Sequence, residues 1–216
     1  MNKYEEQHPY KLLVEGNEDK WAVIALRETQ HLPENFDVID CHCVEEAKKA
    51  LQVRLKSTNN TQRIGIIIDA DTSPQDRWNS VRNILIRSGK YDTTDIPERI
   101  PEDGFIVEPQ DENDIIVGIW IMPDNSAQGM LEDFVCKMTP ENDRLLTKVD
   151  ETLAEIEAKN IAKYKEVHKA KARLRTWLAW QEEPGASIST AIKKGYLSTG
   201  KPDCQEFVNW LKRLFV

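Results

Sequence analysis

The sequence predicts an α/β fold in which a mainly parallel central sheet lies between layers of helices, followed by an α-helical C-terminal region. Three observations carry this prediction. Apolar stretches alternate with helical patterns three times within the first 90 residues. The segment 63–68 ends in an unbroken apolar run, which is typical of a central parallel strand covered on both faces. Beyond residue 140 the chain is highly charged and has few helix breakers, which favours helices.

The strands are expected where short apolar runs are bounded by polar or turn residues. The first is a buried run, the second alternates apolar and polar residues, and the third is the apolar run already described. Two more follow a polar loop at 90–103 and form a hairpin-like pair. We therefore expect strands at 10–14, 36–43, 63–68, 105–107 and 115–122.

The helices are expected where apolar residues recur at spacings of three and four. Gly89 ends the third of them, and Pro184-Gly185 breaks the charged region after residue 140. That region contains one long helix or two joined helices. We expect helices at 18–31, 44–56, 77–88, 129–137, within 142–181, at 188–194 and at 204–215. These boundaries divide the chain into a metal-binding domain of residues 1–139 and a helical extension of residues 140–216 that packs back on the core.

Composition and charge exclude several protein classes. The chain has 216 residues, is 40% hydrophobic and carries a net charge of −8, so it is not a protein that coats nucleic acid through bulk positive charge. No apolar run approaches the length of a membrane span, and no secretory signal is evident. Four scattered cysteines do not form a disulfide framework. We therefore expect a cytoplasmic protein.

Carboxylates follow two of the expected strands. Glu15 comes directly after the first, and Asp19 lies about one helical turn further on, so both can face one point. Gly16 permits the tight turn between them. Asp69 and Asp71 end the third strand, where residues two apart point the same way. Alone, the first motif is a common helix start and the second a common turn, but together they predict a metal site at the carboxyl ends of parallel strands.

A third acidic group follows the last strand. Glu132 opens a helix shortly after Gly129, and Asp124 and Asp133 flank these residues. Loop and helix-capping roles explain Asp124 and Asp133 equally well, so they are secondary candidates. Mg²⁺ prefers hard oxygen ligands, and paired Mg²⁺ ions can activate an attacking oxygen and stabilise a leaving one. The pattern thus indicates metal-dependent chemistry.

These motifs resemble the Toprim domain of topoisomerases, primases and OLD-family nucleases. The family pattern is a glutamate-glycine pair after the first strand, here Glu15-Gly16, and Asp-x-Asp after a later one, here Asp69-x-Asp71. The likeness spans roughly residues 10–137. It is closest to stand-alone Toprim-like proteins of uncharacterised function and to the OLD nuclease domain, which add a later glycine and glutamate, here Gly129 and Glu132.

The resemblance implies roles for these residues and a cofactor. Glu15 would be a metal ligand or general base. The metal ligands would be Asp19, Asp69, Asp71 and Glu132, and the metal Mg²⁺ or Mn²⁺. Where many Toprim proteins carry a further aspartate or glycine soon after Asp-x-Asp, this chain runs Thr-Ser-Pro-Gln-Asp, and it has no tyrosine-bearing cleavage domain. It also lacks the ATPase module of OLD proteins, so a partner protein such as an ATPase is expected.

One stretch, residues 159–175, is strongly basic. It is either a solvated helix balanced by neighbouring glutamates or a face that contacts phosphate. Helical geometry places Lys169 opposite the apolar stripe, in solvent, and Lys171 at the edge of the stripe. OLD-type nucleases have a lysine after the Toprim core, so Lys171 is our candidate for stabilising charge on the scissile phosphate.

The sequence therefore supports two functions. The first is a Mg²⁺-dependent phosphoryl-transfer enzyme acting on DNA or RNA, most simply a nuclease. The second is a non-catalytic Toprim-like module that holds metal or nucleic acid for a partner protein. Neither reading requires a membrane, and neither fixes the oligomeric state.

Overall fold

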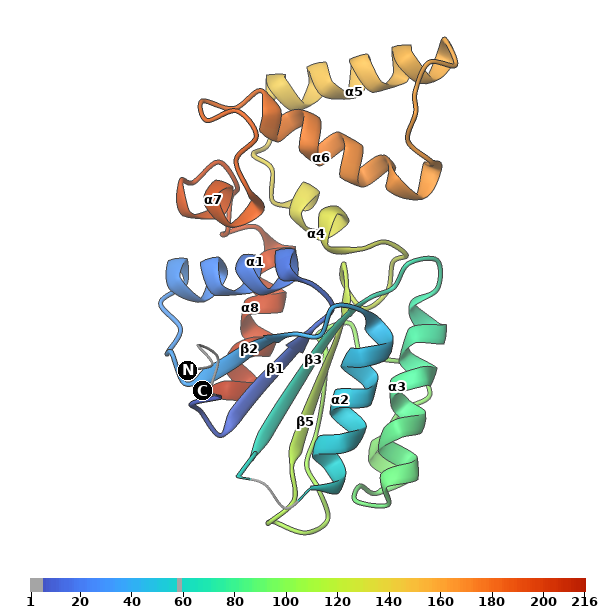
Figure 1. The fold of residues 1–216 in the computed structure, drawn as a ribbon, viewed down its shortest axis with the longest axis vertical. Coiled ribbons are helices and arrows are strands. Elements are labelled where there is room, and N and C mark those ends of the chain that lie inside the picture. The colour runs from blue at the N-terminus through green and yellow to red at the C-terminus, as the bar shows by residue number, and fades with distance from the viewer. Residues whose placement is uncertain (1–5, 58–59) are drawn as a thin grey trace.

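A central sheet organises the fold (Figure 1). The structure is a computed structural model that describes residues 6–57 and 60–216. In this described part, five strands lie in the order β2-β1-β3-β5-β4, and all pairs are parallel except β4 with β5. The strands are β1 (Tyr10–Val14), β2 (Phe36–Asp40), β3 (Arg63–Asp69), β4 (Phe105–Val107) and β5 (Ile116–Met122). The predicted α/β class, with its mainly parallel sheet, is confirmed.

Helices cover both faces of the sheet and continue to the C-terminus. α2 (Val44–Lys56) and α3 (Pro74–Ser88) pack on one face, and α1 (Asn17–Thr29) and α8 (Pro202–Phe215) pack on the other. The remaining helices are α4 (Leu131–Lys137), α5 (Arg144–Ala158), α6 (Lys169–Ala179) and α7 (Ile188–Lys193), with short 3-10 turns η1 (Thr93–Asp95) and η2 (Glu166–His168). No helix in the described residues is long and apolar enough to cross a membrane.

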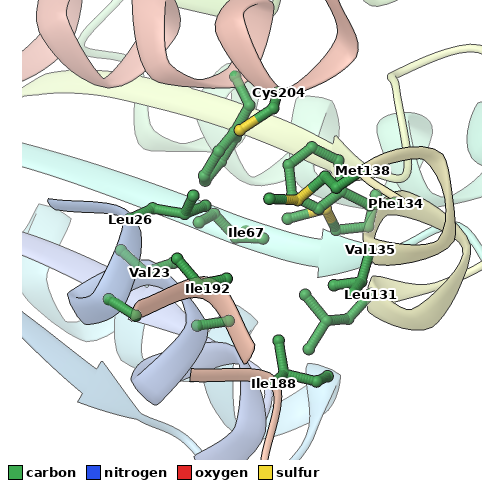
Figure 2. Packing of buried hydrophobic residues seen from close by; sticks show 14 of the residues in the cluster. Val23, Leu26, Ile67, Leu131, Phe134, Val135, Met138, Ile188, Ile192 and Cys204 are labelled. Atoms are coloured by element: carbon green, nitrogen blue, oxygen red, sulfur yellow. The ribbon is translucent and has the colours of Figure 1, made fainter. Parts of the chain in front are cut away.

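Alternation along the strands separates two hydrophobic cores. Leu13 and Ile66 point into the core beneath α2 and α3, whereas Leu12 and Ile67 point into the core beneath α1 and α8. Figure 2 shows the second core, where Ile67 lies among side chains of α1, α4, α7 and α8. Strands β1, β3 and β5 are thus buried on both sides, as the unbroken apolar run in β3 predicts.

Two glycines let α8 approach the sheet closely. Gly65 on β3 and Gly118 on β5 are partners in the strand register. A Cβ atom on Gly65 would lie 3.0 Å from Leu214 Cδ2, and a Cβ atom on Gly118 would lie 2.5 Å from the same atom. Leu214 is fully buried over this pair. α8 is therefore part of the hydrophobic core on the face of the sheet that α1 also covers.

Some element boundaries differ from the predictions. α3 begins at Pro74, not at residue 77, because Ser73 Oγ accepts a hydrogen bond from the Asp76 N–H at 3.2 Å and proline suits the first helical turn. β2 ends at Asp40, three residues early. The charged region 142–181 divides into α5 and α6, and the segment 159–168 between them is not α-helical.

Candidate active site

The carboxyl ends of β1 and β3 meet at one edge of the sheet, because these strands are parallel neighbours. Glu15 follows β1, and its Oε1 accepts a hydrogen bond from the backbone N–H of Asp69 at 2.8 Å. Burial raises the pKa of Glu15, and the Asp69 N–H and Arg77 only partly oppose this effect. The expected convergence of Glu15 and Asp69 is therefore present.

Asp69 links the strand ends to α4. Its Oδ1 accepts a hydrogen bond from the Leu131 N–H, at the start of α4, at 3.0 Å. Burial, and then the charges of Asp19, Glu15 and Glu132, raise the pKa of Asp69 to about 9. Burial and neighbouring carboxylates both disfavour the ionised form of Asp69, and a bound cation would offset the repulsion between these carboxylates.

Asp19 and Glu132 complete the cluster. Asp19, in the first turn of α1, is only 9% exposed, and Glu132 in α4 is only 5% exposed. Burial, followed by the charges of Glu15 and Glu132, raises the pKa of Asp19 to about 7. Four carboxylates, from the end of β1, from α1, from the end of β3 and from α4, thus influence one another. We call Glu15, Asp19, Asp69 and Glu132 the acidic cluster.

Asp71 lies beside the acidic cluster but turns differently from Asp69. Strand β3 ends at Asp69, and Asp71 has a φ of 51°, so strand alternation does not extend to it. Its backbone forms a bridge with Gly129, and its side chain pairs with Arg77 of α3. Gly129 lies two residues before Leu131, whose N–H binds Asp69, so the bridge keeps Asp71 near the cluster.

The glycines of the two motifs have distinct local roles. Gly16 caps α1 in an extended conformation, and a Cβ there would lie 3.3 Å from Asp19 Oδ2. Gly129 has a φ of +134°, and a Cβ there would lie 2.7 Å from Asp133 Oδ2. Both glycines therefore leave room for a neighbouring carboxylate.

The donor chemistry of the acidic cluster suits Mg²⁺. Hard carboxylate oxygens are its preferred protein ligands, and it usually takes one or two of them with water and phosphate. Among residues 6–57 and 60–216, no three His, Cys, Asp or Glu side chains are placed as a ready-made ion cage. The cluster oxygens instead accept hydrogen bonds from Asp69 N–H and Leu131 N–H.

Comparison with known proteins places the chain in a family. The sequence model of the family described as "Protein of unknown function (DUF3226)" matches residues 9–216, nearly the whole chain. The chain belongs to the DUF3226 family. No curated protein and no solved structure matches it.

Lys171 of this DUF3226 protein reaches the acidic cluster from α6. Its Nζ lies 3.1 Å from Glu132 Oε1, and its side chain is half exposed. Lys169, expected in solvent, lies at the surface and pairs with Glu157 at 2.7 Å, away from the cluster. The lysine chosen at the edge of the apolar stripe is therefore the one that contacts the cluster.

The two secondary candidates have structural partners. Asp133 Oδ2 accepts a hydrogen bond from the Met130 N–H at 2.9 Å and caps α4. Asp124 contacts Lys137 Nζ at 2.5 Å, and Lys137 also pairs with Asp203 of α8. Burial opposes ionisation of Asp124, but hydrogen bonds from Lys137, Ala127 and Ser126 outweigh it and lower its pKa to about 2. Both carboxylates therefore make contacts that suit the loop and helix-capping roles considered for them.

The DUF3226 structure also reveals cations around the site that the sequence reading did not select. Arg77 pairs with Asp71, and Arg175 of α6 pairs with Glu18, next to Asp19. Arg77 lies one helical turn inside α3, close behind Asp71 in sequence, which is the signal that could have identified it. Arg175 and Glu18 are 157 residues apart, and no local pattern connects them.

Proposed function

We propose that this protein is a Mg²⁺-dependent phosphoryl-transfer enzyme of Toprim-like type that acts on nucleic acid, most simply a nuclease. The observation that supports it best is the hydrogen bond between Glu15 and Asp69, which joins the ends of two parallel strands inside a buried acidic cluster. Open α/β sheets place their ligands at this edge. Mn²⁺ is the expected substitute for Mg²⁺.

Each residue of the cluster has a proposed role. Asp19, Asp69 and Glu132 would hold the metal, and Asp71 would join them if its pair with Arg77 opens. When bound, Mg²⁺ would supply charge neutralisation and a polarised oxygen. Glu15 Oε1 is held by the Asp69 N–H, which leaves Oε2 to accept the proton of an attacking water. Lys171 Nζ, released from Glu132, would neutralise charge that develops on the phosphate.

The second candidate is a non-catalytic module that holds metal or nucleic acid for a partner such as an ATPase. The observation that favours it is the ion pairing of the cations nearest the cluster: Lys171 with Glu132, Arg77 with Asp71 and Arg175 with Glu18.

Four free thiols suit a reducing compartment, and we place the protein in the cytoplasm on either reading.

Cleavage assays separate the two candidates. Supercoiled plasmid and structured RNA are incubated with the protein and with Mg²⁺ or Mn²⁺. The enzyme reading expects nicking or cleavage that disappears in Glu15→Gln and Asp69→Asn, and that persists in Glu206→Gln, an exposed residue of α8. Metal binding without cleavage of either substrate, or cleavage that survives both substitutions, contradicts it.

A further inference from the structure

The segment between α5 and α6 forms a basic tip at one end of the molecule. We call residues 159–168 the hairpin tip, because α5 and α6 lie side by side beyond α4 and this segment joins them (Figure 1). Lys163 and Lys165 are exposed and have no ion pair within the described residues. Ile161 and Val167 beside them are 57% and 50% exposed. The hairpin tip thus combines two unpaired lysines, next to the exposed carboxylate of Glu166, with exposed apolar surface.

The cations of α6 differ from those of the hairpin tip, because each has a carboxylate partner. The pairs are Lys169 with Glu157, Lys171 with Glu132, Arg173 with Asp150, and Arg175 with Glu18. Residues of α6 therefore fasten this helix to α5 on one side and to α4 and α1 on the other. In the region formed by α5, α6 and the hairpin tip, Lys163 and Lys165 are therefore the lysines that keep their charge available for a ligand.

Internal hydrogen bonds hold the hairpin tip in one conformation. Tyr164 donates its hydroxyl hydrogen to Glu157 Oε1 at 2.7 Å. The Ile161 N–H donates to the carbonyl of Ile156 at 3.0 Å, and the His168 N–H donates to the carbonyl of Lys165 at 2.8 Å. These bonds order the backbone from which the lysines project, which lowers the entropic cost of binding a ligand.

A cleft leads from the hairpin tip to the edge of the sheet. Its volume is about 540 Å³. Its lining includes Glu166, Val167 and Lys169 on the α6 side and Asp71, Gly129 and Asp133 on the sheet side. Because Asp71 lies beside the acidic cluster, one end of this cleft is next to the proposed reaction centre. The other end opens at the tip.

We propose that the hairpin tip binds the phosphodiester backbone of a nucleic-acid strand and directs it along this cleft. Lys163 and Lys165 would contact phosphates, and Ile161 and Val167 would contact sugars and bases. This inference rests on the proposed function, because the cleft leads a strand to a reaction centre only if the acidic cluster is that centre. An anionic membrane would also attract basic and apolar residues, but it would not use a cleft that runs inward to an acidic centre.

Binding without metal tests the proposal apart from cleavage. Fluorescence anisotropy of a labelled single-stranded DNA oligonucleotide and of an RNA hairpin is measured in EDTA over a range of salt concentrations. For Lys163→Ala/Lys165→Ala we expect roughly tenfold weaker binding and a salt slope smaller by about 2, one unit for each lost phosphate contact. The control Lys56→Ala/Lys212→Ala removes two exposed lysines elsewhere and should change the affinity by less than about twofold.

The possible results are distinct. Equal affinity of the tip variant and the control variant for both oligonucleotides overturns the proposal. A second result also overturns it: the wild type sediments with phosphatidylserine vesicles and the tip variant does not, yet both proteins bind the oligonucleotides equally well. A wild-type protein that binds through the tip yet cleaves nothing contradicts the nuclease assignment and leaves the tip assignment standing.

Discussion

Substitution of Gly129 by alanine is a direct test of how the loop beside the acidic cluster is built. Gly129 has a φ of +134° and exchanges two backbone hydrogen bonds with Asp71, at 2.8 and 2.9 Å. A Cβ atom would lie 2.7 Å from Asp133 Oδ2 and 2.8 Å from Asp133 Cγ. Asp133 would have to move, and the hydrogen bond by which it caps Met130 N–H would be lost.

The expected cost combines two terms. A non-glycine residue in this sparsely populated region of φ costs about 1–3 kcal/mol. Loss of a helix cap costs about 1 kcal/mol more. The free energy of unfolding should therefore fall by about 2–4 kcal/mol, which for a chain of this size lowers the melting temperature by roughly 5–15 °C.

Thermal and urea unfolding, followed by circular dichroism, measure this loss. The matched control is Gly89→Ala. Gly89 also has a positive φ, of 68°, at the end of α3, but nothing lies within 4 Å of its Cβ position. That control should lose only about 1–2 kcal/mol, the cost of the left-handed conformation alone. If Gly129→Ala unfolds at the same temperature as the control or above it, the steric reasoning is wrong.

Three further predictions concern single side chains. Lys171→Ala should slow cleavage and lower stability by about 1–3 kcal/mol, because its removal leaves the buried Glu132 without this partner; unchanged cleavage would contradict this. Asp124→Asn should destabilise the protein by about 1–2 kcal/mol at neutral pH, since pairing with Lys137 lowers the pKa of Asp124 from 3.8 to about 2. That stabilisation is present above pH 3.8 and is lost as the pH falls through 2, so urea unfolding of wild type and variant should converge in acid. Leu214→Ala should cost about 2–5 kcal/mol in one cooperative unfolding transition, and a second, separate transition would show that α8 is not part of the core.

Much of the fold could be predicted because the deciding signals are local. The apolar run that became β3, and the alternation of strands and helices around it, dictate a parallel sheet buried on both faces. The convergence of Glu15 and Asp69 follows from the same signals, since neighbouring parallel strands end at one edge. The position of Lys171 at the edge of the apolar stripe of its helix also follows from local helical spacing.

Other features depend on contacts that the sequence does not encode locally. Asp71 does not continue the strand beyond Asp69. It has a positive φ and its backbone pairs with Gly129, so the alternation of side chains along the strand ends before it. The break between α5 and α6 falls in a charged segment without proline or glycine, so composition alone did not locate it. Asp124 pairs with Lys137, which also pairs with Asp203 of α8. Folding brings these three residues together, and no local pattern in the sequence connects them.

Isothermal titration calorimetry of Mg²⁺ and Mn²⁺ binding tests the central claim, that the buried carboxylates at the ends of β1 and β3 form a divalent-cation site. Wild-type protein and Glu206→Gln should show saturable binding of either ion, and Asp69→Asn should lose it or weaken it at least about tenfold, as loss of a ligand does. If Asp69→Asn binds both ions as tightly as wild type, or if wild type binds neither, the carboxylates do not form that site.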